Sequence, residues 1–135
     1  MMTEAEIERL VRGFEDGSLP HSEWTHAAHL RAAAWYLSRR TREQATSLVR
    51  DGLQRFNRIH GRGEGYHETI TLAWVAVVAG FLARSGPEMP FSEAARTLVE
   101  ECGDKEYLLR YYSRELLMSA EARRGWVPPD LHPLE

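Results

Sequence analysis

The chain has 135 residues, of which 43% are hydrophobic and 27% charged, a composition typical of one globular domain and not of a disordered segment. The net charge of −3 gives no sign of the basic face of a general nucleic-acid binder, so no nucleic-acid partner is expected. The single cysteine, Cys102, excludes an intrachain disulfide. The first 17 residues are acidic and contain no apolar stretch, which predicts a cytoplasmic protein without a secretory signal.

Three amphipathic helices are predicted in the first half of the chain, because apolar residues recur there every three or four positions. Two of these helices begin with a capping box, in which a threonine is followed three residues later by Glu or Gln. The boxes are formed by Thr3 with Glu6 and by Thr41 with Gln44. The predicted helices span residues 3–16, 22–39 and 41–60.

The most apolar stretch of the chain, residues 67–84, predicts a central helix. No charged residue occurs between Leu72 and Ala83. A helix that is apolar on every face must be buried on every face. The apolar run is shorter than the roughly 20 residues of a membrane span, so a core helix is favoured and no membrane partner is expected.

The remainder of the chain predicts further helices and an extended tail. Apolar spacing favours a helix over residues 92–102, starting at Ser92, and another over residues 105–112. Residues 125–135 are too rich in proline for a helix and should lie as a strap over the bundle. The predicted fold is all-α: a single domain (residues 1–135) of five or six helices around the central helix.

Three histidines and a glutamate predict a metal site near the start of the central helix. His26 and His29 are three positions apart on the second helix, so both rings are expected to point the same way. If that helix neighbours the central one, His26, His29 and His67 would converge on a divalent metal such as zinc, iron, manganese or nickel. His67 and Glu68 would then be the catalytic residues, with Glu68 as a general base for hydrolytic or oxygen chemistry.

The same residues allow two other interpretations. In the first, the exposed amides at the N-terminus of the central helix bind a small carboxylate or phosphate without a metal. Nearby arginines, among them Arg58, Arg62 and Arg110, could add positive charge, whereas Glu68 would repel an anion. In the second, the histidines are hydrogen-bonded core residues of a structural or interaction protein. The predicted ligand-binding residues are Tyr66, Thr71, Asn57, Ser113 and Arg114.

Three motifs in the chain resemble a family of small bacterial all-helical proteins. The motifs are WTHAAHL (24–30), YHETIT (66–71) and YYSRELLMSAEAR (111–123), and Trp126 with Pro129-Asp130 fits the end of the pattern. The resemblance covers roughly Phe14 to Leu134. The family has no assigned biochemical activity, so the resemblance implies an all-helical fold and a complete chain but no reaction. A monomer and a homodimer are both compatible with the sequence.

Overall fold

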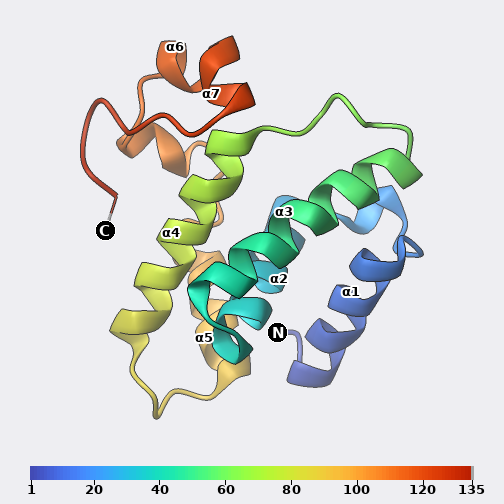
Figure 1. Cartoon of the computed structure of the whole chain (residues 1–135). Coiled ribbons are helices and arrows are strands. Elements are labelled where there is room, and N and C mark those ends of the chain that lie inside the picture. The colour runs from blue at the N-terminus through green and yellow to red at the C-terminus, as the bar shows by residue number, and fades with distance from the viewer. Residues whose placement is uncertain (135) are drawn as a thin grey trace.

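The computed structural model describes residues 1–134 and contains helices but no strand within that range (Figure 1). The predicted all-α class is therefore confirmed. The structure has seven α-helices over residues 1–134, whereas five or six helices were predicted. Two of the seven are short helices near the C-terminus. The α-helices are α1 (Glu4–Asp16), α2 (His26–Arg39), α3 (Arg42–Ile59), α4 (Glu68–Ser85), α5 (Phe91–Cys102), α6 (Arg114–Leu117) and α7 (Ala120–Arg124), and the 3₁₀ turns are η1 (His21–Glu23) and η2 (Tyr107–Arg110).

Side-chain caps fix most of the helix starts. Both predicted capping boxes are present, with the Thr3 and Thr41 hydroxyls accepting hydrogen bonds from backbone amides of the first turn. Ser113 and Ser119 cap the short helices α6 and α7 in the same way. Each cap provides a partner for an amide that would otherwise lack one, typically contributing about 1 kcal/mol.

Three element boundaries differ from the sequence-based prediction. The second helix is split: η1 forms a separate turn, and Thr25 caps α2 by accepting from the Ala28 amide. Helix α5 follows Pro90 and has no side-chain cap, so Ser92 lies inside the first turn. Residues 105–112 form only the turn η2, because the Asp104 carbonyl accepts from the Tyr107 amide and closes a tight turn there.

Helices α2 and α4 together form the centre of the bundle. Helix α2 contacts α1, α3, α4 and α5, and α4 contacts α2, α3, α5 and α7. Fully buried alanines on α2, including Ala28 and Ala34, leave room for these neighbours to approach closely. One core cluster lies around Phe14 and Phe56 on the α1–α3 side, and a second lies around Val78 on the α4–α5 side.

Helix α4 is central, but it is not buried on every face as predicted. Leu72, Ala79 and Gly80 are partly exposed, and Ala83 is exposed. By length and composition alone α4 could cross a membrane. Its packing against α2, α3 and α5 is instead that expected of the core helix of a soluble protein.

The C-terminal strap lies extended across the N-terminal end of α4, as predicted (Figure 1). The Thr69 hydroxyl donates to the Gly125 carbonyl at 2.8 Å and accepts from the Val127 amide at 3.1 Å. The Tyr112 hydroxyl donates to the Val127 carbonyl at 2.7 Å. These bonds fix one side of the α4 N-terminus against the strap and helices α6 and α7.

Candidate functional site

A cavity of about 390 Å³ lies on the other side of the α4 N-terminus, between α2, α3 and the loop that joins α3 to α4. This volume is within the range of about 300–1,000 Å³ that is typical of small-molecule pockets. Most of the wall is apolar. The apolar lining residues are Phe14, Trp24, Leu30, Ala32, Ala33, Val49, Leu53, Ile70, Trp74 and Val75, and the other lining residues are His21, His29, Asn57, Arg62, Gly65, Tyr66, His67 and Thr71.

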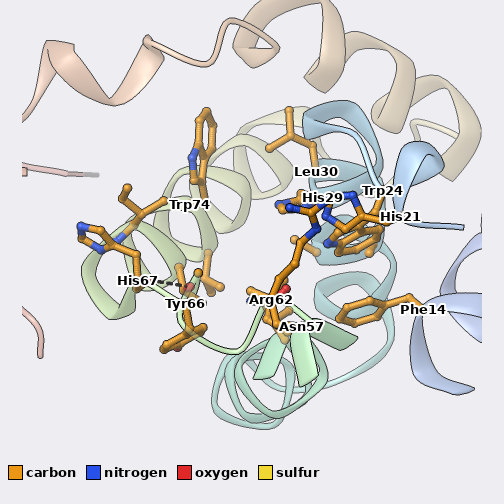
Figure 2. A pocket seen from close by; sticks show the side chains of 18 residues that line it. Phe14, His21, Trp24, His29, Leu30, Asn57, Arg62, Tyr66, His67 and Trp74 are labelled. Carbon is orange, nitrogen blue, oxygen red and sulfur yellow. Dashed lines mark hydrogen bonds between the residues drawn. The ribbon is translucent and has the colours of Figure 1, made fainter. Parts of the chain in front are cut away.

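Polar residues line the cavity on two sides, with Tyr66 and His67 on the side of Trp74 and the two other lining histidines on the opposite side (Figure 2). His21 and His29 lie together beside Trp24, and the side chain of Arg62 extends from the α3–α4 loop toward them. Trp74 lies across the cavity from this group. The permanent positive charge of the described lining therefore lies on the side of Arg62, across the cavity from Trp74.

The His29 ring packs against an aromatic ring and makes no hydrogen bond within residues 1–134. The Trp24 indole lies between two rings, with its centroid 4.3 Å from Phe14 and 4.3 Å from His29. The His29 side chain is accessible through the cavity, and within residues 1–134 its ring nitrogens have no hydrogen-bond partner. Desolvation by the surrounding protein, with smaller contributions from His26 and His21, lowers the pKa of His29 from 6.5 to about 4. The ring is therefore neutral at pH 7.

Arg62 is positioned by the backbone of its loop. Its amide donates to the Asn57 carbonyl at 2.6 Å, and its carbonyl accepts from the Gly65 amide at 2.9 Å. Gly61, with φ of +70°, allows the chain to leave α3 in this direction. The Arg62 guanidinium makes no ion pair or hydrogen bond within residues 1–134, so its charge is available to a ligand.

His21 is the one lining histidine that the sequence analysis did not single out. Its ring lies 6.4 Å from Phe56 and 6.1 Å from His60, measured between ring centroids. Desolvation lowers the pKa of His21, and the charges of Arg62 and His60 add to that effect. A histidine in a short polar turn carries no pattern that would have marked it beforehand.

Glu68 belongs to a separate ion pair behind the cavity wall. Arg50 binds its carboxylate through both Nε (3.2 Å) and an Nη atom (2.9 Å), and the Tyr66 hydroxyl donates to the same carboxylate. Burial would raise the pKa of Glu68, but the bonds from Arg50 and Tyr66 outweigh it and lower that pKa. Burial and the bond to Glu68 raise the pKa of Tyr66 to about 12. Glu68 does not line the cavity, so its geometry is that of a residue that positions Tyr66.

His67 has both ring nitrogens engaged in structural hydrogen bonds. Nδ1 accepts from the Ile70 amide at 3.1 Å and so caps α4. Nε2 lies 2.7 Å from the Leu117 carbonyl, which can only accept, so Nε2 carries the proton. The ring points away from the cavity (Figure 2), which leaves no nitrogen free to bind a metal or to act as a base.

The predicted convergence of three imidazoles is not found. The His26 ring packs edge-on against Trp74, with 4.7 Å between centroids, and lies near the Cys102 backbone, while its buried Nε2 has no hydrogen-bond partner within residues 1–134. It therefore faces α5, whereas His29 faces the cavity. Over residues 1–134, no group of three or more His, Cys, Asp or Glu side chains is arranged to hold one metal ion.

The five predicted ligand-binding residues divide between two regions. Tyr66, Thr71 and Asn57 line the cavity. Ser113 instead caps α6, and Arg114 forms an exposed ion pair with Glu106 at 2.8 Å, so neither reaches the cavity. Ser113 and Arg114 are separated from the cavity because the segment after α5 packs against the far side of α4.

The Trp24 indole N–H, in the cavity wall, has no hydrogen-bond partner within residues 1–134. A buried donor without a partner costs free energy, and an acceptor entering beside it is one way to recover that cost.

In comparisons with known proteins, no family model, curated protein or solved structure matches this chain. The resemblance to a bacterial helical family therefore stays a prediction, and the function must be argued from the cavity itself.

Proposed function

We propose that this protein binds a small organic anion, with an apolar body, in the cavity beside the N-terminus of α4, and that it does so without a metal. The observation that carries the proposal is the state of the polar lining groups. Within residues 1–134, the side chains of His21, His29, Asn57 and Arg62 have no hydrogen-bond partner in the protein, although they face a cavity of ligand size. Polar groups left free at a concave, mostly apolar surface are typical of ligand sites.

The charges of the lining favour an anion. Among the described lining residues, Arg62 carries the only permanent positive charge, and none is Asp or Glu. The repulsion expected from Glu68 is countered, because Arg50 neutralises this carboxylate outside the cavity. The two oxygens of a carboxylate can accept two parallel hydrogen bonds from one edge of a guanidinium, which makes Arg62 the natural anchor.

The apolar wall favours a ligand with a hydrocarbon or aromatic body. Trp74 lies across the cavity from Arg62, and Ile70 and Leu30 also line the wall, so an acid that places its charge near Arg62 would bury its body against apolar side chains. Burial of apolar surface contributes about 25 cal/mol for each Å² removed from water. Simple inorganic anions lack this contribution and should bind more weakly than aromatic acids.

The two other interpretations receive less support. A metal site made of His26, His29 and His67 would require rings that converge, and both nitrogens of His67 are already bonded. A purely structural protein would give the free cavity groups no role.

The proposal is tested with phenylacetate and its neutral analogue phenylacetamide, in thermal-shift and calorimetric titrations at low salt. Phenylacetate should raise the Tm and give a saturable binding heat in the presence of chelator, and phenylacetamide should bind more weakly by about tenfold or more. Equal affinities for phenylacetate and phenylacetamide would contradict the proposal. It would also be contradicted if phenylacetate, phenylacetamide and phenyl phosphate all failed to bind.

A cavity-filling variant locates the site. Ala33 lines the cavity from α2, so Ala33→Leu should abolish phenylacetate binding while the Tm of the free protein stays the same or rises. Ala83→Leu, on the exposed face of α4, is the matched control and should bind as the wild type does. If both variants bind equally well, the ligand sits elsewhere.

Location, oligomeric state and partners can also be proposed for this protein. We infer a cytoplasmic bacterial protein, acting as a monomer or homodimer on a small molecule, with no nucleic-acid partner. The modest negative charge and the core position of α4 support this setting.

A further inference from the structure

His29 is a basic group that the fold keeps uncharged. Its ring rests on Trp24 and opens to the cavity, with no carboxylate among the described lining residues to stabilise a charged form. The titratable or charged groups around it are His21 from η1, His26 from α2 itself, and Arg62, Tyr66 and His67 from the segment between α3 and α4. Among the described lining residues, α1 contributes Phe14 and α3 contributes Val49, Leu53 and Asn57, none of which is titratable.

Each of these neighbours leaves the environment of His29 without negative charge. Arg62 is a cation, and the Tyr66 hydroxyl is tied to Glu68 and stays protonated. His67 forms hydrogen bonds with backbone groups away from the cavity, and His26 packs against Trp74. His29 is thus an accessible neutral base in the same cavity as an unpaired arginine, and among the described lining residues a protonated ring would find no counter-ion.

An anion in the cavity reverses this situation. Arg62 and His29 line the same cavity, and Arg62 extends toward the group that His29 forms with His21 (Figure 2), so a carboxylate anchored on Arg62 can approach the His29 ring. An opposite charge within about 4–6 Å of an imidazole favours its protonated form. The anion would then supply the missing counter-ion for a second positive charge.

We propose that His29 takes up a proton from solvent when an organic acid binds, so that binding at this site is coupled to proton uptake. The inference rests on the proposed function and adds its regulation. The bound state is a carboxylate held between the Arg62 guanidinium and the His29 imidazolium. His29 is accordingly the residue that makes the site favour acids at lower pH.

The direction of the pH effect follows from linkage. Burial holds the pKa of free His29 at about 4, and a bound anion would raise that pKa. Between the free and the bound pKa, each unit of rising pH should weaken binding by up to about tenfold, because one proton must be supplied with the ligand. Phenylacetate itself stays ionised above about pH 5, so its own titration does not interfere.

The test is calorimetric titration of phenylacetate from about pH 5 to about pH 8, in pairs of buffers with different ionisation enthalpies. Wild-type protein should take up close to one proton per ligand in the acidic part of this range, with affinity falling as pH rises. His29→Gln should bind with almost no uptake and with little dependence on pH. His132→Gln, on the exposed tail, should retain the wild-type uptake, and His21→Gln tests whether the other lining histidine takes up the proton instead.

The outcomes separate this inference from the function on which it rests. Absence of binding at every pH would overturn the proposed function. Binding by wild-type protein with no proton uptake, or with the same uptake in His29→Gln, would overturn the coupling alone. If proton uptake were lost in His21→Gln but kept in His29→Gln, the group that takes up the proton would be His21, which would contradict the proposal. Circular dichroism of the variants at each pH shows that the compared proteins are folded.

Discussion

The two sides of the α4 N-terminus treat polar side chains in opposite ways. On the strap side, His67 and Thr69 are buried, and their polar side-chain atoms have backbone partners. On the cavity side, His29 and Arg62 face open space without any partner within residues 1–134. The two histidines lie at neighbouring helices, yet one closes a hydrogen-bond network and the other is left free.

This contrast shows how the role of a polar residue can be judged. A satisfied buried group contributes to stability, and removing it leaves its partner without a bond. A group left unsatisfied at a cavity wall contributes little to folding and is available for binding. The comparison predicts that mutations on the strap side damage stability, and mutations on the cavity side damage ligand binding.

The largest effect is expected at His67. His67→Ala removes the cap of α4 and leaves the Leu117 carbonyl without its partner, so the free energy of unfolding should fall by about 2–4 kcal/mol. Urea denaturation followed by circular dichroism measures this change. His132→Ala should be neutral, and a loss below about 0.5 kcal/mol for His67→Ala would remove the distinction between the two sides.

A smaller loss is expected at Thr69. Thr69→Val keeps the shape of the side chain but breaks both bonds to the strap, which should cost about 1–2 kcal/mol and expose the C-terminal segment to protease. Thr46→Val is the control, because the hydroxyl that it removes donates only to the Arg42 carbonyl in the preceding turn of the same helix. If the control were as destabilising and as protease-sensitive as Thr69→Val, the strap contacts would not be the cause.

The pH dependence of stability sharpens the comparison at His29. The folded state depresses the pKa of His29 from 6.5 to about 4, so full stability is present above about pH 6.5 and is lost as pH falls toward 4. His29→Gln lacks this loss. Its Tm should therefore decline less than the wild-type Tm over this interval, as measured by calorimetry without ligand. Parallel declines would mean that the His29 ring is ordinarily solvated.

The smallest stability effect is expected at Arg62. Arg62→Gln should change the free energy of unfolding by less than about 0.5 kcal/mol, because the guanidinium has no partner to lose. The same change should weaken phenylacetate binding by about tenfold, the equivalent of about 1.4 kcal/mol. Arg58→Gln, on exposed α3 surface outside the cavity, should alter neither quantity. Equal affinities in the two variants would exclude Arg62 as the anchor.

The sequence predicts the fold class and most helix starts, because these depend on local patterns. The capping boxes at Thr3 and Thr41 and the apolar spacing of α1 and α3 each act within a few residues. Thr25 was harder to recognise, since apolar spacing alone allowed α2 to begin earlier, at Ser22. The partly exposed face of α4 depends on what packs beside it, and composition gives no information on that.

The candidate site was predicted only in part, because it depends on which helix faces which. Residues three positions apart on a helix differ in direction by about 60°. Helix α2 lies between two core clusters, so this difference sends His26 toward α5 and His29 into the cavity. Asn57, Tyr66 and Thr71 do line the cavity, as predicted, whereas Ser113 and Arg114 lie beyond reach on another surface.

The most direct test of this account is a long-range ¹H–¹⁵N spectrum of the histidine side chains, recorded with and without saturating phenylacetate near pH 6. The His29 ring nitrogens should move from the pattern of a neutral ring to that of a protonated one. The His67 nitrogens should keep the pattern of a single neutral tautomer protonated at Nε2. An unchanged His29, or a shift confined to His67, would contradict the assignment of one side of α4 to binding and the other to structure.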